Sequence, residues 1–282
     1  AQRKVISVKM QASIAGNEDL RDPARNFTLI AAPNFPELTD ELVTLNTDRC
    51  ETAFIVIDTP MRKTPTEVVE WVQGNLASEN GTDGLTTKYT YSAAYYPAGR
   101  STDTAGNTVT VPPSHMVLYQ YAFNDQIAYP WFAPAGLNRG GLNVGRAEVK
   151  LTSGMRDTLY DARVNPIATF PATGVCIWGQ KTLQVRPTAL DRINVRRLLI
   201  AVKKFIASSS KYLVFEQNTI ATRNSFLSQV NPYLESVQQR QGLYAFKVVM
   251  DDTNNTPDVI DRNQLVGQIY VQPTRTAEFI YL

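Results

Sequence analysis

The first part of the chain alternates continuous apolar runs with segments whose apolar residues recur at helical spacing. Strands are predicted at 27–35, 52–60 and 89–97, and helices at 37–50, 64–75 and 114–126. The run TAFIVIDTP at 52–60 is apolar almost without interruption, which is typical of a parallel strand buried on both faces. This order of elements predicts an α/β domain over residues 1–150.

Residue types at the predicted helix starts support these assignments. Thr64 is a suitable N-cap, Pro65 occupies the first helical position, and Glu67 completes a capping box. Ser114 is predicted to cap the helix at 114–126. Ser153 is predicted to cap a further helix at 153–165.

The second half mixes helices with strands whose pattern suits an antiparallel sheet, which predicts an α+β domain over residues 151–282. Strands are predicted at 174–185, 211–218, 243–252, 264–274 and 277–282, and amphipathic helices at 191–210 and 222–240. Pro232 is expected to kink or restart the second of these helices after Asn231.

Two segments of the first half are predicted to be irregular. Residues 98–107 are rich in turn formers and predict a loop. The segment Tyr129–Gly141 combines aromatic residues with proline and glycine, which excludes regular structure but indicates order. We expect a crossover between two α/β halves, with Trp131 and Phe132 packed on the core and tight turns at the glycines. A contact surface is the alternative.

Composition excludes several classes of function. The 282 residues are 43% hydrophobic and 19% charged, as in folded globular proteins, and no run approaches the roughly 20 apolar residues of a membrane span. The net charge of +2 implies no general attraction to nucleic acid or membranes. The two cysteines, Cys50 and Cys176, are expected to be reduced and buried. One histidine and two cysteines offer almost no metal ligands, so neither metal nor cofactor is predicted.

Candidate catalytic chemistry is equally sparse. A serine–histidine–aspartate triad would need His115, the only histidine, with Asp58 and either Ser114 or Ser153. Ser114 and His115 are adjacent, which makes a working geometry hard to reach, and neither serine lies in a G-x-S-x-G motif. The glycines at 136–145 lack a phosphate-loop context. The polar segment 251–264 lacks the order of a calcium-binding loop, so we interpret it as a turn-rich connection.

The helix at 191–210 carries basic residues beside its apolar stripe. These are Arg192, Arg196, Lys203 and Lys204. The basic pairs Arg196–Arg197 and Lys203–Lys204 could bind nucleic acid, but the helix does not interleave them with exposed aromatics, so a solvated or ion-paired face is the competing interpretation.

Several stretches in order resemble the contractile tail sheath proteins of large myovirus-type bacteriophages. They are VPPSHMVLYQYAFNDQIAYPWFAPAGLNRG, YDARVNPIATFPATGVCIWGQKTL, DRINVRRLL, LVFEQNTIATRNSF and DDTNNTPDVIDRNQLVGQIYVQPTRTAEFIYL. The resemblance covers roughly residues 90–282 by motif and the earlier residues by pattern only. Each motif is weak alone, and their common order is what makes the resemblance specific.

The resemblance implies a core with subtilisin-like topology but without the catalytic triad. In subtilisin order, the histidine lies between the aspartate and the serine. If Ser114 occupies the serine position, there is no histidine between Asp58 and Ser114. The resemblance and the residue inventory therefore both argue against an enzyme.

The resemblance also implies a function. Sheath subunits stack as six-subunit rings in a helical array around the tail tube and contract to drive the tube through the host envelope. The implied partners are other copies of the chain, the tube protein, the baseplate and the tail terminator, without nucleic acid and without membrane binding by the chain itself. The implied location is the virion tail, after assembly in the host cytoplasm.

In this family the C-terminal part faces the tube, so Arg192, Arg196, Lys203 and Lys204 become candidate tube or subunit contacts. Terminal arms in the family add strands to sheets of neighbouring subunits. The chain starts without Met and ends in mid-pattern. We therefore expect a fragment lacking one or both arms, which would be monomeric or weakly associating.

Three other functions remain open. One is the sheath of a related contractile injection system, such as a secretion system or tailocin. A degenerate hydrolase-like enzyme and a nucleic-acid binder belong to different classes.

Overall fold

The computed structural model describes residues 2–75, 85, 89–171 and 173–278, and its contacts divide the chain into two compact units. The first unit ends at Ile200 and the second begins at Ala201. The division lies within helix α7 (Ile193–Ser210), rather than at the sequence-based boundary of 150/151. The reason is that strands after residue 151 join the sheet of the first unit.

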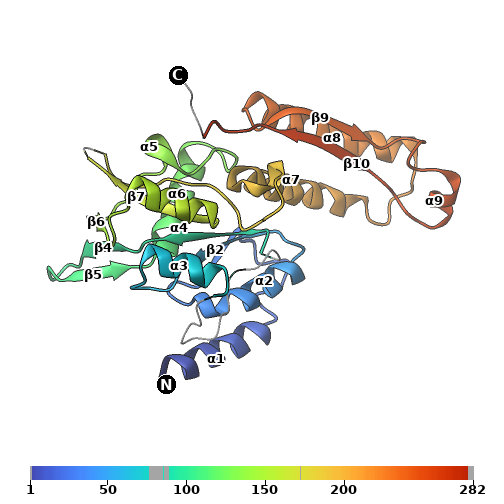
Figure 1. Ribbon diagram of the computed structural model, residues 1–282. Coiled ribbons are helices and arrows are strands. Elements are labelled where there is room, and N and C mark those ends of the chain that lie inside the picture. The colour runs from blue at the N-terminus through green and yellow to red at the C-terminus, as the bar shows by residue number, and fades with distance from the viewer. Residues whose placement is uncertain (1, 76–84, 86–88, 172, 279–282) are drawn as a thin grey trace. The chain divides into compact units, whose positions relative to one another are not determined.

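The first unit is built on a five-stranded sheet of order β1-β2-β3-β7-β8 (Figure 1). Its strands are β1 (Leu29–Ala31), β2 (Phe54–Asp58), β3 (Ser92–Tyr96), β7 (Val164–Phe170) and β8 (Gly174–Ile177). The first four strands in this order are parallel, and β8 is antiparallel to β7. The predicted strands at 27–35, 52–60 and 89–97 are thereby confirmed, and the mixed α/β class of this unit is confirmed as well.

Helices cover both faces of this sheet. They are α1 (Gln2–Ala15), α2 (Thr39–Asp48), α3 (Pro65–Val72), α4 (Pro113–Ile127), α5 (Gly136–Arg139), α6 (Ser153–Asp161) and the first part of α7, with short 3₁₀ turns at Pro36–Leu38 and Ala189–Asp191. Alternate residues of β2 explain the three layers. Phe54 and Val56 belong to a core shared with α4, whereas Ile55 and Ile57 belong to a core shared with α2.

One helix start follows the sequence-based prediction and two differ from it. Thr64 caps α3, and the predicted capping box with Glu67 is present. Thr152, rather than Ser153, caps α6 through a bond from the Met155 amide. Ser114 is not the N-cap of α4, because that helix already begins at Pro113.

Strands occupy two places where the sequence did not predict them. The expected loop at 98–107 contains β4 (Gly99–Thr102), which pairs with β5 (Thr108–Val111) and β6 (Arg146–Ala147) in a second sheet of order β5-β4-β6. The β4–β5 hairpin projects from the first unit (Figure 1). The predicted helix at 153–165 ends at Asp161, and β7 begins three residues later, at Val164.

The aromatic segment Tyr129–Gly141 is irregular apart from the single turn of α5. Trp131 is buried and stacks on Tyr129, with ring centroids 4.8 Å apart. Asn124 donates from Nδ2 to the carbonyl oxygens of Tyr129 and Phe132 at 3.4 and 3.2 Å. Gly136 has φ of +81°, which a side chain would disfavour. The expectation of a buried Trp131 is confirmed, whereas Phe132 is only half-buried, and the segment lies inside the first unit rather than between two α/β halves.

The second unit is α+β in arrangement. It contains the rest of α7, a 3₁₀ turn at Lys211–Leu213, α8 (Ile220–Gln239), β9 (Leu243–Val249), α9 (Pro257–Asp261) and β10 (Gln268–Pro273). Strands β9 and β10 pair in an antiparallel hairpin that runs alongside α8 (Figure 1). Phe226, Val230, Leu234 and Val237 form the buried face of α8.

Three expectations for this unit need correction or qualification. The predicted strand at 211–218 is absent. A 3₁₀ turn occupies Lys211–Leu213 instead, and the side chains of Tyr212, Val214 and Phe215 are exposed. Helix α8 does not restart at Pro232 but continues through it. The predicted strand at 277–282 lies largely outside the described residues, since 279–282 are not described.

Candidate functional site

Asp58 ends strand β2 at the carboxyl edge of the parallel strands, where α/β proteins commonly form their sites. Its Oδ1 accepts the backbone N–H of Ser114 at 2.6 Å. Its Oδ2 accepts the Ser114 hydroxyl at 2.8 Å and the backbone N–H of Asn34 at 2.6 Å. Asp58 therefore caps the start of α4 from a distant strand, since Pro112 offers no side-chain cap.

The environment of Asp58 opposes its ionisation. Burial raises the pKa of this carboxyl, and the three hydrogen bonds from Asn34 and Ser114 oppose that rise only in part. Ser114 itself is fully buried. The pair thus joins sheet to helix, with its polar atoms turned toward each other.

The residues of the rejected triad do not meet. The Ser114 hydroxyl bonds directly to Asp58, without an imidazole between them. His115 is exposed on α4 and follows the buried Ser114. Ser153 is the first residue of α6 and is exposed. This arrangement offers a structural hydrogen bond, and no described hydroxyl is activated by His115.

The four basic residues proposed for helix 191–210 have different surroundings. Arg192 forms an ion pair with Asp191 at 3.0 Å. Arg196 is buried, donates from Nε to the Leu190 carbonyl at 3.0 Å, and bonds to Gln184. These two arginines belong to the first unit, where the structure uses their charges internally.

Lys203 and Lys204 belong to the second unit. Lys203 is exposed and Lys204 is half-buried. The four residues therefore do not form one uniform solvent-facing basic stripe.

Arg197, which the sequence offered beside Arg196 as a candidate nucleic-acid contact, is a buried cation. It pairs with Asp125 at 2.5 Å and lies over the Tyr121 ring at 4.6 Å. Tyr121 in turn bonds to the hydroxyl of Tyr95 on β3, and both tyrosines are fully buried. This chain of contacts fixes the first turns of α7 to α4 and the sheet. The adjacent Arg196–Arg197 pair in the sequence was its only signal.

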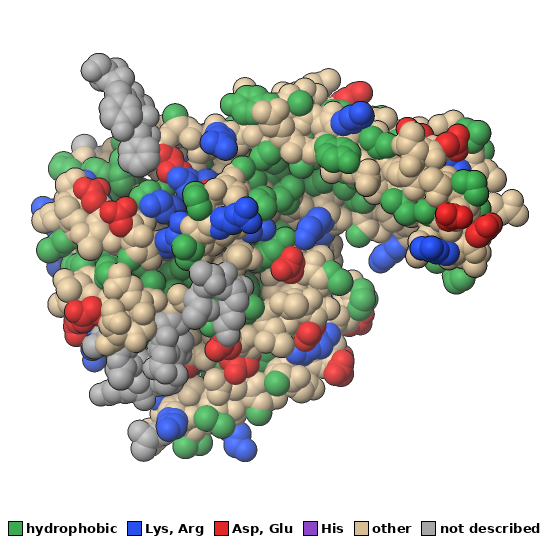
Figure 2. Space-filling view, turned by 45° about the vertical axis from the view of Figure 1, so that its right-hand side comes forward, with side chains coloured by type: hydrophobic (Ala, Val, Ile, Leu, Met, Phe, Trp, Pro, Cys, Tyr) green, Lys and Arg blue, Asp and Glu red, His purple; other side chains and the backbone are tan. Residues whose placement is uncertain are grey.

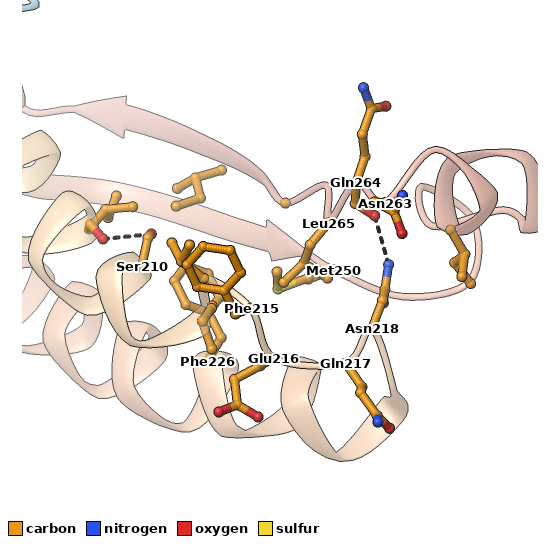
Figure 3. Close-up of a pocket in the computed structure, with 16 residues that line it drawn as sticks. Ser210, Phe215, Glu216, Gln217, Asn218, Phe226, Met250, Asn263, Gln264 and Leu265 are labelled. Atoms are coloured by element: carbon orange, nitrogen blue, oxygen red, sulfur yellow. Dashed lines mark hydrogen bonds between the residues drawn. The ribbon is translucent and has the colours of Figure 1, made fainter.

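The second unit contains an open cavity of about 910 Å³ near the end of α7. Figure 3 shows Phe226, Met250 and Leu265 close together, with Phe215 beside them. Phe215 is fully exposed and has φ of +71°, in the left-handed region that bulky residues rarely adopt. The cavity therefore combines apolar and polar lining residues with a strained, exposed aromatic residue.

A polar network closes the far end of this cavity. Asn218 donates from Nδ2 to the Gln264 carbonyl at 2.9 Å (Figure 3). The buried Arg223 donates to Asn218 Oδ1 at 2.8 Å and to Asp252 at 2.5 Å. Asn255, also buried, bonds to the backbone of Val266 in both directions at 2.8 Å. The polar segment 251–264 is thus held by amide and guanidinium groups, in keeping with a turn-rich connection.

The surface carries both signs of charge. Lys, Arg, Asp and Glu side chains are interspersed on the face shown in Figure 2, as the net charge of +2 suggests. Within the described part of the chain, no three His, Cys, Asp or Glu residues are grouped to hold a metal ion. Among the same residues, no helix has the length and apolarity needed to cross a membrane.

The cysteines differ from the expectation of two buried thiols. Cys176 is buried, and burial raises the pKa of its thiol to about 11. Cys50 is exposed instead, at a left-handed turn with φ of +58° after α2.

Comparison with known proteins finds sheath proteins both by sequence and by structure. Residues 186–282 match the phage tail sheath C-terminal domain. Over 162 residues, 57% of the chain, it is 45% identical to the tail sheath protein of Vibrio phage KVP40 and 42% identical to that of Enterobacteria phage T4. These alignments cover 24% and 25% of the two relatives, so the chain spans about a quarter of the length of the curated relatives it matches.

The fold is similar to that of a solved sheath. The helical sheath of the anti-feeding prophage in its contracted state superimposes with a TM-score of 0.75 at 25% identity, covering 95% of this chain and 72% of that one. The chain is therefore similar to bacteriophage tail sheath proteins, and residues 186–282 match the C-terminal domain of phage tail sheaths. The resemblance expected from the ordered sequence motifs is confirmed.

Proposed function

We propose that the chain is a structural subunit of a contractile bacteriophage tail sheath. Copies stack in six-subunit rings around the tail tube, and their contraction drives the tube through the host envelope. The observation that carries the proposal is the 45% and 42% identity to two tail sheath proteins over 57% of the chain. The partners are further copies of the chain, the tube protein, the baseplate and the tail terminator. The location is the virion tail, with assembly in the host cytoplasm.

Association between copies supplies the mechanism. Head-to-tail contacts that do not close generate a helical array. The first unit has hydrophobic cores, and the second unit buries one face of α8. Packed cores resist deformation, so the change in the length of the sheath falls on the contacts between copies. Exposed ion pairs contribute only about 0–1 kcal/mol each, so repetition over many copies provides the driving energy.

The α/β core is subtilisin-like in topology without peptidase activity. The positions of Asp58 and Ser114, on a strand end and a helix start, support this reading, and so does the direct bond between them. A degenerate hydrolase remains the rival from another class. A peptidase assay on the purified protein, with Ser114→Ala as the control, separates the two: activity lost in Ser114→Ala would contradict the proposal.

The second unit supplies contacts with the tube and with neighbouring copies. Lys203, which is exposed, and Lys204, which is half-buried, are the contact candidates in this unit, while Arg192 and Arg196 bond within the first unit. The β9–β10 hairpin is a two-stranded sheet, and such a sheet gains stability when terminal arms of neighbours add strands to it.

A sheath of a related contractile injection system is the second candidate. The likeness to the anti-feeding prophage sheath favours it, whereas the sequence identities favour a phage tail. Electron microscopy of particles from the producing cell distinguishes them, because only a phage tail carries a DNA-filled head.

The experiment that tests the function is assembly. The full-length gene product, mixed with its tube protein, is expected to form striated sheaths around tubes in negative-stain images. A product that stays dispersed with tubes present, and leaves the tubes bare, would contradict the proposal.

A further inference from the structure

Helix α4 carries an apolar ridge on the face that points away from the core. Tyr119, Phe123 and Ile127 are spaced four residues apart, and they are between 41% and 58% exposed. The opposite face, which includes Val117 and Tyr121, is buried in the main core of the first unit. A surface helix normally turns polar residues to solvent, so a helix that is apolar on both faces indicates a further contact.

The ridge also lacks charge. Residues 113–124 contain no Lys, Arg, Asp or Glu, and the first charged residue of α4, Asp125, is held by the buried Arg197. Aromatic residues without charged neighbours are typical of the centre of protein interfaces, where Lys, Glu and Asp are depleted. The ridge therefore suits an apolar polypeptide surface rather than an anion or a nucleic acid.

Helix α1 carries a second exposed apolar stripe. Small and β-branched residues recur along it at intervals of three and four positions, and all of them are exposed: Val5, Val8, Ala12 and Ala15. The other side of α1, with Met10 and Ile14, packs on the core that α2 shares with the sheet. Large and small residues on facing positions interdigitate in packed cores. The stripe of α1 therefore complements the bulky ridge of α4.

The two helices lie on opposite sides of the five-stranded sheet. Helix α4 shares a core with Phe54 and Val56, whereas α1 packs on the core that contains Ile55 and Ile57. Figure 1 shows the same order, with α4 on one side of β2 and α1 beyond α2 on the other. The ridge and the stripe therefore cannot meet within one copy. They can meet between successive copies, and such a head-to-tail contact generates an open array.

The dimensions of the two stripes agree. At a rise of about 1.5 Å per residue, the ridge from Tyr119 to Ile127 spans about 12 Å, and the stripe from Val5 to Ala12 spans about 10 Å. An antiparallel arrangement sets Tyr119 against Ala12 and Ile127 against Val5. It also brings the exposed Lys4 near the carboxyl end of α4, where the helix dipole favours a cation.

We propose that the outer ridge of α4 docks on the exposed stripe of α1 in a neighbouring copy of this chain. This rests on the proposed function, because a sheath array holds identical copies at fixed spacing and high effective concentration. Three or four side chains on each helix bury much less than the roughly 800 Å² per partner of a stable interface. The contact is therefore weak for a single pair of copies and gains strength by repetition.

Cysteine cross-linking in assembled sheaths tests the pairing. The exposed Cys50 is first removed by Cys50→Ser, and Val8→Cys and Phe123→Cys are then combined in the full-length gene product. Under a mild oxidant we expect covalent chains of three or more copies, because each copy contributes one cysteine to each of two contacts. Val8→Cys combined with Met155→Cys is the control and should give no chains, since Met155 is as exposed as Phe123 but lies on α6.

Single-cysteine variants identify other occupants of the ridge. If α4 met α4 of a second copy, Phe123→Cys alone would give covalent dimers, and that result would overturn the pairing. Covalent dimers of Val8→Cys alone would indicate a contact between two α1 helices, with the same consequence. Protection of the Phe123→Cys thiol from alkylation by tube protein alone would assign the ridge to the tube instead.

A charge exchange gives a second readout. Phe123→Glu places a carboxylate in an apolar contact, so it should raise the subunit concentration needed for assembly by about tenfold. Met155→Glu should assemble like the unmodified protein. Adding Val8→Lys to Phe123→Glu should restore most of the loss, because opposite charges then face each other. A thermal melt identifies any variant that has lost its fold, in which case the cross-linking experiment decides.

Two results would overturn the proposal while leaving the proposed function in place. One is normal sheaths in which Val8→Cys with Phe123→Cys gives no more cross-linking than the control pair. The other is a folded Phe123→Glu variant that assembles as readily as Met155→Glu. If the unmodified protein forms no sheath on tubes, the proposed function itself fails.

Discussion

The Ser114 hydroxyl donates a hydrogen bond to Asp58 at an oxygen–oxygen distance of 2.8 Å, although the residues lie 56 positions apart. The same carboxylate accepts the Ser114 amide and the Asn34 amide. One buried carboxyl group therefore ties the end of β2 to the start of α4. The aspartate and the serine thus stabilise the fold through hydrogen bonds that require no histidine.

Removing the Ser114 hydroxyl should weaken the fold without abolishing it. Ser114→Ala deletes one hydrogen bond to a buried carboxylate, while the backbone amide remains bonded. We expect a loss of about 1–2 kcal/mol in the free energy of unfolding, measured by urea denaturation. Ser13→Ala, at an exposed position of α1, is the control and should change stability by less than about 0.5 kcal/mol. Equal effects of the two substitutions would show that the bond contributes nothing.

The raised pKa of Asp58 predicts a pH dependence with a defined sign. The folded state holds this proton more tightly than the unfolded state does, so the stabilising contribution is complete below about pH 4, near the unfolded pKa. It is lost as the pH rises through the folded pKa. The free energy of unfolding of the unmodified protein, relative to Asp58→Asn, should therefore fall as pH increases from 4 to 7. A difference that rises over this range would contradict the assignment.

Charge reversal should separate Arg196 from Lys203. Arg196→Glu places an anion among groups that now accept hydrogen bonds, so it should lower the melting temperature. Lys203→Glu changes an exposed side chain and should leave the melting temperature within a few degrees.

A double charge-reversal variant tests the tube contact. If Lys203 and Lys204 face the tube, the double reversal Lys203→Glu/Lys204→Glu should reduce sheath formation on purified tubes, more strongly at low salt. Unchanged assembly by a correctly folded double variant would rule out this contact.

Phe215 should contribute little to the stability of the free subunit. Its side chain is fully exposed, and asparagine tolerates the left-handed backbone better than phenylalanine does. We expect Phe215→Asn to keep or slightly raise the melting temperature, whereas Phe226→Asn in the buried face of α8 should lower it strongly. A large destabilisation by Phe215→Asn would mean that the ring packs inside the cavity in solution.

The sequence predicts those elements whose signals are local. The uninterrupted apolar run at 52–60 predicts β2, and the Thr64–Glu67 capping box predicts the start of α3. The amphipathic stripe at 191–210 predicts α7. The order of motifs also identifies the family, because several weak motifs in one order constrain it together.

Elements that depend on distant partners escape such reasoning. Strand β7 contains Asn165 and Pro166, which argue against a central strand. Asn165 is accommodated because its amide bonds to the carbonyl oxygens of Ala94 and Lys181, at 3.2 and 2.8 Å. Conversely, the strand-like pattern at 211–218 finds no neighbouring strand, so its apolar residues remain exposed.

The candidate site was predicted least well, for the same reason. Helical spacing places Arg196 beside the apolar stripe, but cannot reveal that Gln184 and the Leu190 carbonyl cover it.

The most direct test of the account is a pair of cryo-electron microscopy reconstructions of the assembled full-length gene product, before and after contraction. We expect a helical array in both, with Cα positions inside each compact unit agreeing within about 1 Å and the contacts between copies rearranged. Refolding of the five-stranded sheet or of the β9–β10 hairpin between the two states, or failure to form any helical array, would contradict it.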